Sequence, residues 1–276
     1  MRNEPLVGYL LHQRSYQEKR AIYYLFSEQH GVVHGIGKKG APLFEPLQLF
    51  ATGKRDLKTF TQMTIIPFER PIRDNQALEQ TDKTDKQVTN ASSDYLANQT
   101  NHLPESSTTQ RYGQIRGQQQ YAALYLNEIL WKLLPTEDPM PVLWQYYQNS
   151  LNLLKQSLSA EELRLCLRQF EQQLFKELGF ALSLTEDSSL EAIDAESTYR
   201  FLADTGFMPV IAEAPTESAP TSSLFRGEEI LAMAKLGITA ATINSWSRLN
   251  RQLIDQLLDY QPLQSRLLWQ QQQRYQ

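Results

Sequence analysis

Apolar residues recur every three or four positions between residues 163 and 180, in the sequence LRLCLRQFEQQLFKELGF. This period places them on one face of an α-helix. The members of that face are Leu163, Leu167, Phe170, Leu174 and Leu178. Gly179 predicts the end of the helix, because glycine adopts the left-handed conformation at low cost. Arg164 and Arg168 lie one turn apart beside this face. The segment is therefore either a plain core helix or a helix that also presents two guanidinium groups.

The same helical period recurs through the C-terminal half of the chain. It predicts further helices over residues 121–134, 140–158, 227–236, 243–260 and 263–273. Residues 185–225 lack this period, and we expect a small irregular subregion there, with two short strands near residues 197–201 and 206–210. The sequence therefore predicts a helical domain over residues 120–276.

Residues 5–70 contain five short segments rich in Leu, Val, Ile, Tyr and Phe, separated by turn signals about every ten residues. Five short strands in this length are typical of a small β-barrel. The OB-fold is the first choice and an SH3-like barrel the second. The expected fold class is α+β: an N-terminal five-stranded OB-fold barrel over residues 1–73, followed by an α-helical C-terminal domain.

Residues 74–119 differ in kind, because Gln, Asn, Thr, Ser and Asp dominate them. Such a segment cannot bury enough apolar surface to offset the entropy lost on ordering. We therefore expect a disordered polar insertion between the barrel and the helices.

The net charge of −4 conceals an asymmetry between the two halves. Residues 1–73 hold eleven Lys or Arg against six Asp or Glu, a net charge of +5, which leaves −9 for the remainder. A basic small domain favours a polyanion as its partner. The basic side chains fall mainly in the predicted turns. The candidate DNA-binding residues are Arg14, Lys19, Arg20, Lys38, Lys39, Lys54, Arg55 and Lys58.

No catalytic or cofactor motif stands out, and the four histidines lack the spacing of a metal site. The single cysteine, Cys166, lies in an apolar helix, where a buried thiol is expected rather than a nucleophile. We find no apolar run long enough for a membrane span and no signal-peptide pattern. These features predict a cytoplasmic binding protein that is not an enzyme and has neither metal nor cofactor.

Several motifs occur together in the order typical of the bacterial recombination mediator RecO. Its central-helix pattern R-x-F-E-x-x-L-x-x-x-L-G-[YF] is matched by Arg168, Phe170, Glu171, Leu174, Leu178, Gly179 and Phe180. Its Y-x-N-E box is matched by Tyr125, Asn127 and Glu128, and its barrel loops by residues 37–40 and 53–59. The sequence resembles this family outside residues 74–119 and the loops near 185–223. It departs from the family in a shortened basic loop after residue 40 and in lacking the four zinc-binding cysteines of some members.

The resemblance implies a function and a set of partners. It implies binding of single- and double-stranded DNA, annealing of complementary strands, and loading of RecA with the partner RecR. It also implies binding of the acidic, apolar C-terminal tail of single-stranded-DNA-binding protein. Arg168 matches the family's tail-binding arginine, and the further candidates for this pocket are Arg164, Leu167, Phe170 and Tyr147.

Two other functions stay open at this point. The shortened basic loop and the overall negative charge also fit a protein-only adaptor with little or no DNA binding. A hydrolase with an unrecognised site is the third and weakest possibility.

Overall fold

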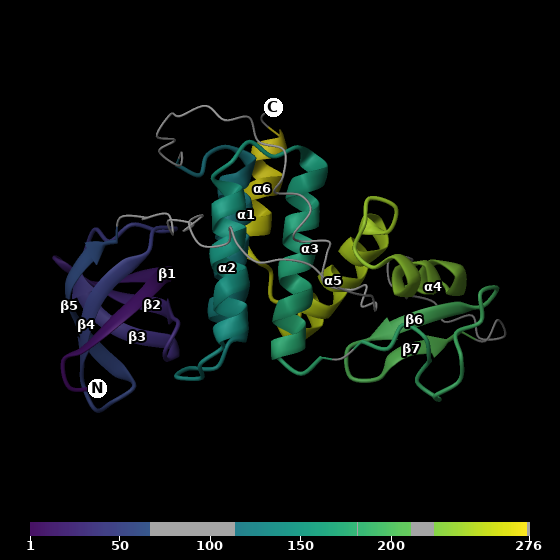
Figure 1. The fold of residues 1–276 in the computed structure, drawn as a ribbon, viewed down its shortest axis with the longest axis horizontal. Helices are drawn as coiled ribbons and strands as arrows, with labels where there is room; N and C mark the ends of the chain where they lie inside the picture. The colour runs from purple at the N-terminus through teal and green to yellow at the C-terminus, as the bar shows by residue number, and fades with distance from the viewer. Residues whose placement is uncertain (67–113, 181, 211–223, 275–276) are drawn as a thin grey trace, which may run out of the picture. The chain divides into compact units, whose positions relative to one another are not determined.

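A computed structural model of the protein describes residues 1–66, 114–180, 182–210 and 224–274. The chain begins with five strands: β1 (Glu4–Gln17), β2 (Arg20–Ser27), β3 (Gly31–Lys38), β4 (Leu47–Thr52) and β5 (Leu57–Ile65). They close into a barrel in the order β1-β2-β3-β5-β4, with β4 pairing back onto β1 (Figure 1). Only β3 and β5 pair in parallel. This five-stranded closed arrangement confirms the predicted barrel.

Alternation of side chains explains why these segments close around a core. In β4, for example, Leu47, Leu49 and Ala51 are buried while the residues between them are more exposed. Successive side chains on a strand point to opposite faces, so one apolar set fills the interior. Leu6, Leu10, Tyr23, Leu25 and Val33 complete much of this core.

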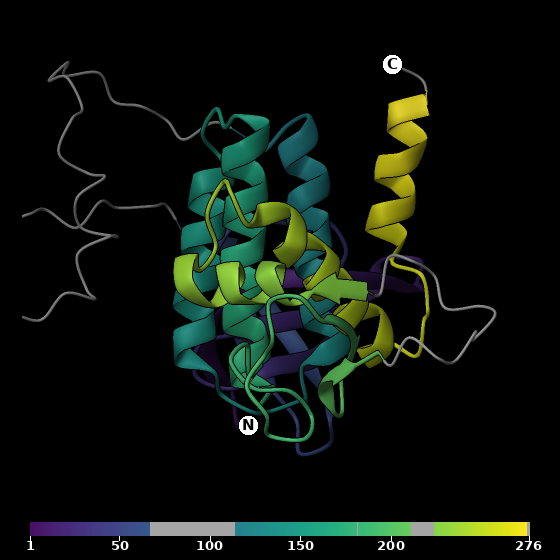
Figure 2. The same cartoon turned by 90° about the vertical axis from the view of Figure 1, so that its right-hand side faces the viewer.

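The described residues after the barrel form six helices: α1 (Gln118–Leu133), α2 (Pro141–Leu154), α3 (Ala160–Glu177), α4 (Gly227–Leu236), α5 (Ile243–Leu257) and α6 (Gln264–Arg274). Helices α1, α2 and α3 run alongside one another, α6 packs on α1, and α5 packs on α3 (Figures 1 and 2). Helix α3 begins with a capping box, in which Ser159 and Glu162 satisfy each other's backbone amides. Helix α1 begins at Gln118, slightly before the predicted boundary at residue 120. Of the predicted insertion, residues 74–113 lie outside the described residues.

A small sheet lies between α3 and α4 in the sequence. Strands β6 (Thr198–Leu202), β7 (Gly206–Pro209) and β8 (Leu224–Arg226) pair in the order β7-β6-β8. Phe201, Phe207 and Phe225 pack together and are buried. The sequence predicts β6 and β7, whereas β8 is too short to give a period. Aromatic packing thus stabilises this small sheet.

The barrel contacts the helices through a polar side chain on α1. The β1–β2 pairing is irregular between Leu10 and His12, which is typical of a β-bulge. The Asn127 amide Nδ2 donates to the carbonyls of Leu10 and Leu11 at 3.0 and 3.1 Å, and its Oδ1 accepts from the Tyr147 hydroxyl at 2.6 Å. Asn127 thus joins α1 to the barrel and to α2.

A turn between α1 and α2 makes a second contact with the barrel. Glu137 donates its backbone N–H to the Val32 carbonyl at 2.9 Å. Gly31 takes a positive φ of 63°, and a Cβ there would lie 1.9 Å from the Asp138 carbonyl oxygen. Only glycine allows this approach of the two backbones. Within the described ranges, no helix is both long and apolar enough to span a membrane.

Candidate functional site

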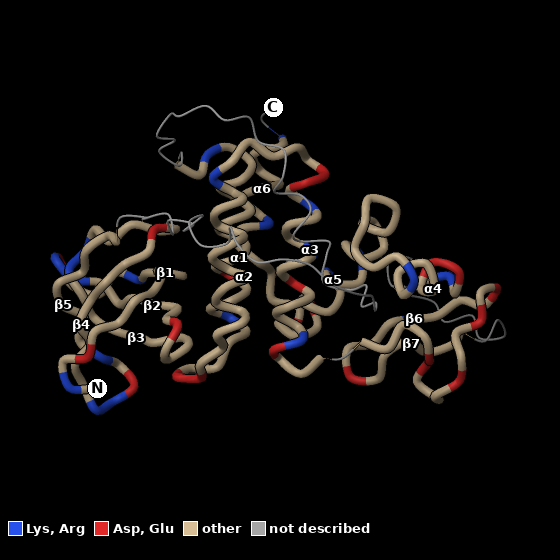
Figure 3. The backbone as a smooth tube through the Cα atoms, viewed as in Figure 1, with Lys and Arg blue, Asp and Glu red and all other residues tan. Residues whose placement is uncertain are grey.

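The exposed cations among the predicted DNA-binding residues form two groups at opposite ends of β3 (Figure 3). The first group lies around the β1–β2 turn and the end of β3, where Arg20 pairs with Lys38 and Lys39 donates its N–H to the Lys19 carbonyl. Its members are Arg14, Lys19, Arg20, Lys38 and Lys39. The second group, Lys54 and Arg55, lies in the β4–β5 loop. In OB-folds, the loops between β1 and β2 and between β4 and β5 flank the nucleic-acid-binding face.

Lys58 is an exception among the predicted DNA-binding residues. It is only 5% exposed, and its Nζ donates to the Arg55 carbonyl at 2.8 Å and lies 2.6 Å from Glu137 Oε1. Its charge is thus neutralised inside the protein, and a phosphate cannot reach it. The prediction that Lys58 contacts DNA is wrong. The side chain instead ties the β4–β5 loop to the turn before α2.

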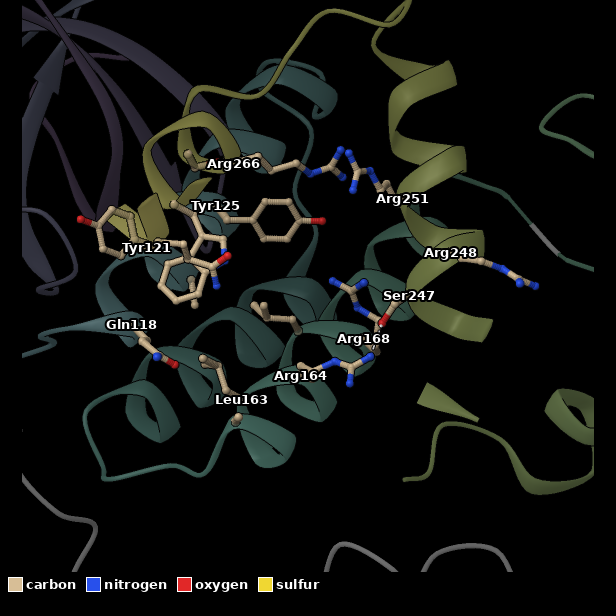
Figure 4. Close-up of a pocket in the computed structure, with 16 residues that line it drawn as sticks. Gln118, Tyr121, Tyr125, Leu163, Arg164, Arg168, Ser247, Arg248, Arg251 and Arg266 are labelled. Carbon is tan, nitrogen blue, oxygen red and sulfur yellow. Dashed lines mark hydrogen bonds between the residues drawn. The ribbon is translucent and has the colours of Figure 1, made fainter. Parts of the chain in front are cut away.

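A cavity of about 600 Å³ opens between α1, α3, α5 and α6 (Figure 4). Its apolar surface comes from Leu163 and Leu167 on α3 and from aromatic rings on α1 and α6. Two of these rings, Tyr121 and Trp269, contact each other with centroids 5.5 Å apart. Its polar lining is rich in arginine: Arg164, Arg168, Arg248, Arg251 and Arg266. A concave apolar surface with a few convergent charges is the usual form of a ligand site.

A buried carboxylate holds Arg168 in place at this pocket. Glu171 is fully buried and accepts hydrogen bonds from Arg168 Nη2 at 2.6 Å and from Asn250 Nδ2 at 2.8 Å. The Tyr125 hydroxyl donates to the same carboxylate. Burial raises the pKa of Tyr125, and the charge of Glu171 raises it further, so the phenol remains a neutral donor. These contacts from α1, α3 and α5 fix the orientation of the guanidinium.

The other arginines differ in how their charge is compensated. Among the described residues, Arg164 has only neutral partners, Asn244 Oδ1 at 2.7 Å and Ser247 Oγ at 3.4 Å. Arg251 and Arg266 both pair with Asp255, and Arg248 pairs with Glu229. The pocket therefore carries more positive than negative charge and can receive an anionic ligand.

The structure brings together three of the five residues predicted for tail binding, Arg164, Leu167 and Arg168. It corrects the other two, because Tyr147 and Phe170 are fully buried and do not line the pocket. Phe170 lies two residues after Arg168, so it points to nearly the opposite side of α3. Its ring packs toward Tyr147 in the core, with centroids 6.3 Å apart.

Sequence reasoning missed the lining residues on α1, α5 and α6, chiefly Tyr121, Tyr125, Arg251, Arg266 and Trp269. Each looks like an ordinary surface or core position in its own helix, and no local pattern tells which helices meet. Over the described part of the chain, no cluster of three or more His, Cys, Asp or Glu side chains could hold a metal ion.

Comparison with known proteins places this geometry in a family. The family model "Recombination protein O C terminal" matches residues 117–267, more than half of the chain and the whole pocket-forming region except its last residues. The chain belongs to the RecO family. The DNA repair protein RecO of Stutzerimonas stutzeri (strain A1501) is 30% identical over 273 residues, covering 95% of this chain and 92% of that protein. The RecO of Pseudomonas putida (strain GB-1) is 29% identical over 272 residues, covering 96% of each chain. The family resemblance read from the sequence motifs is confirmed.

Proposed function

We propose that this protein acts in DNA repair and recombination as a mediator that binds and anneals single-stranded DNA. The names of its RecO relatives support a role in DNA repair. The observation that carries DNA binding is the placement of exposed cations on both loops that flank the ligand face of an OB-fold barrel. Tyr16, about half exposed on the β1–β2 hairpin, is available to stack on a base.

The physics of this proposal requires no catalytic residues. Lysine and arginine side chains neutralise phosphates and release counterions, which favours binding and lowers the repulsion between two strands. We place the protein in the cytoplasm with the nucleoid DNA. We also propose that it helps load RecA together with RecR, which rests on the family resemblance alone.

We further propose that the arginine-lined pocket binds the acidic C-terminal tail of single-stranded-DNA-binding protein. A terminal carboxylate needs a cation, and the neighbouring apolar side chains need a cavity. Arg168, held by Glu171, and Arg164, which has only neutral partners in the described chain, border the apolar residues Leu163 and Leu167.

DNA binding is tested by fluorescence anisotropy of a labelled single-stranded oligonucleotide over a salt series. Replacing both Lys54 and Arg55 with Glu should weaken binding and lower the salt slope by up to roughly 1.4, at about 0.7 per single-strand phosphate contact. The matched control replaces Lys176 and Lys235, exposed on α3 and α4, with Glu, which changes the net charge equally. An unchanged slope in the barrel variant would remove these residues from the interface. No salt-dependent binding by the unmodified protein would favour the protein-only adaptor.

Tail binding is tested with a labelled peptide of the tail sequence. Arg168→Ala should weaken peptide binding much more than oligonucleotide binding, because Arg168 lies on α3 and the proposed DNA contacts lie on the barrel. Thermal unfolding of the variant checks that leaving the buried Glu171 carboxylate without Arg168 has not disrupted the fold. Equal losses in peptide and DNA binding would contradict the assignment.

A further inference from the structure

Helix α2 presents an exposed face that has no charged residue. Of the six helices in the described part of the chain, it is the one whose sequence lacks Asp, Glu, Lys, Arg and His. Surface helices of globular proteins normally place charged side chains on the face opposite the core. Depletion of charge together with exposed tyrosine is instead typical of the centre of a protein–protein interface. This face therefore has the composition of a contact surface.

The exposed apolar residues of α2 form a continuous stripe. Val142, Tyr146 and Leu153 are 46%, 36% and 40% exposed, and the exposed Asn149 lies between the last two. The spacings along this stripe are four, three and four residues, which is the repeat of a coiled-coil seam. The residues that α2 buries in the core are a separate set. The stripe is therefore available to a second molecule.

The stripe is complementary to itself. In an antiparallel pair of α2 helices related by a two-fold axis between residues 147 and 148, Val142 lies opposite Leu153 of the second copy. The same axis places Tyr146 opposite Asn149 of the second copy. Apolar side chains then meet at both ends of the seam, and the Tyr146 hydroxyl can donate to the Asn149 amide oxygen near its centre. Because the interface is two-fold symmetric, each of these contacts occurs twice.

The flanks of the stripe favour a second copy over a different helix. In coiled coils, charged residues beside the seam select a partner of complementary charge. Gln145 and Asn152, which directly precede Tyr146 and Leu153, lie beside this seam and are neutral. Amide side chains can hydrogen-bond to copies of themselves, and no like charges on α2 would oppose one another across the axis.

We infer that two copies of this chain associate through α2, packed antiparallel along the stripe formed by Val142, Tyr146, Asn149 and Leu153. A 14-residue helix is about 20 Å long, so this contact is small and predicts a reversible dimer. A dimer contains two barrels. Together with the proposed DNA binding, on which this consequence rests, it would hold two strands at a high effective concentration for annealing.

Sedimentation equilibrium of the full chain without DNA measures the association. We expect a dimer with a dissociation constant on the order of 10–100 µM. Val142→Lys and Leu153→Glu each place a charge on the seam, and each should weaken association by roughly tenfold or more. The matched controls, Leu236→Lys and Leu190→Glu, place the same charges at exposed leucines outside α2 and should leave it unchanged. Circular dichroism checks that each variant is folded.

An equimolar mixture of Val142→Lys and Leu153→Glu tests the pairing itself. In the antiparallel pair, the introduced lysine of one copy faces the introduced glutamate of the other, and the second such layer keeps its unmodified valine and leucine. The mixture should therefore form a mixed dimer nearly as readily as the unmodified chain. A mixture that associates no better than either variant alone would overturn the antiparallel contact.

Other outcomes also decide the inference. It is overturned if the unmodified chain stays monomeric up to about 500 µM, or if both seam variants dimerise like the controls. These measurements involve no DNA, so their failure leaves the proposed DNA binding standing. In a separate assay, each seam variant should bind one labelled oligonucleotide as tightly as the unmodified chain but anneal two strands more slowly, and the mixture should recover the rate. An unchanged annealing rate would overturn the link between dimer and annealing.

Discussion

Asn127 offers the sharpest test of how the barrel is attached to the helices. Its side chain is almost fully buried and satisfies three groups at once: the carbonyls of Leu10 and Leu11 and the hydroxyl of Tyr147. The two carbonyls lie beside the irregular point in the β1–β2 ladder. Asn127→Ala would remove the side-chain partners of all three polar groups in a region that excludes water.

The magnitude follows from the cost of buried polar groups without partners. Each such group costs about 1–3 kcal/mol. A carbonyl has a second lone pair and tolerates the loss somewhat better than a donor does. We therefore expect Asn127→Ala to lower the free energy of unfolding by about 3–5 kcal/mol, a large part of the 5–15 kcal/mol typical of a folded domain.

Two matched variants separate this explanation from simple loss of packing. Tyr147→Phe removes one hydroxyl and should cost only about 1–2 kcal/mol. Asn127→Asp keeps the size of the side chain but replaces the amide donor with an acceptor facing two carbonyls, so it should be at least as destabilising as Asn127→Ala.

Urea unfolding followed by circular dichroism measures these differences. With a slope near 3 kcal/mol per molar urea, Asn127→Ala should lower the midpoint by about 1 M or more. A loss below about 1 kcal/mol would refute the reasoning, since it would mean that the carbonyls find other partners. A better tolerance of Asn127→Asp than of Asn127→Ala would also refute it, because size rather than donation would then matter.

Two further predictions concern ionisable groups. Burial lowers the pKa of His12 and His34 below the ordinary 6.5, so their contribution to stability is complete above pH 6.5 and is lost as the pH falls. The urea midpoint should therefore decline between pH 7 and pH 5, and His12→Gln, which removes the ring stacked on Trp131, should flatten that decline. If His12→Gln left the pH dependence of the urea midpoint unchanged, this explanation would be contradicted. Burial raises the pKa of the Cys166 thiol to about 11, so in the folded protein at pH 8 it should react with a disulfide reagent at least about a hundredfold more slowly than in urea. Equal rates would show that the thiol is accessible.

Local sequence patterns predict many of the strands and helices, but not the features that depend on contacts between residues far apart in the sequence. Short segments rich in β-branched, leucine and aromatic residues predict the barrel strands, and apolar residues at spacings of three and four predict α3. Lys58 shows the limit. In the sequence it looks like its neighbours Lys54 and Arg55, and only the approach of Glu137 from the turn before α2 buries and neutralises it. A basic residue in a predicted turn is only a candidate DNA contact, because the sequence does not show which side chains the fold places beside it.

The pocket shows the same limit in another form. Arg164 and Arg168 are one turn apart on a single helix, so the sequence alone places them together. Arg251 lies on α5 and Arg266 on α6, and both pair with Asp255, so their meeting depends on how these two helices pack. Residues on one helix could be assigned to the site, whereas residues that complete it from other helices could not.

One short stretch of α1 connects these separate features. Tyr125 bonds the carboxylate that holds Arg168, and Asn127 satisfies the bulged carbonyls of the barrel. Glu128 accepts the backbone N–H groups of Gln264 and Ser265 and so caps α6, the helix that brings Arg266 to the pocket. These polar residues lie in an otherwise apolar helix, and each would be costly there without its partner. Each of these three residues forms a contact that joins α1 to another part of the chain. Tyr125, Asn127 and Glu128 are therefore a better guide to how this fold is assembled than the apolar residues around them.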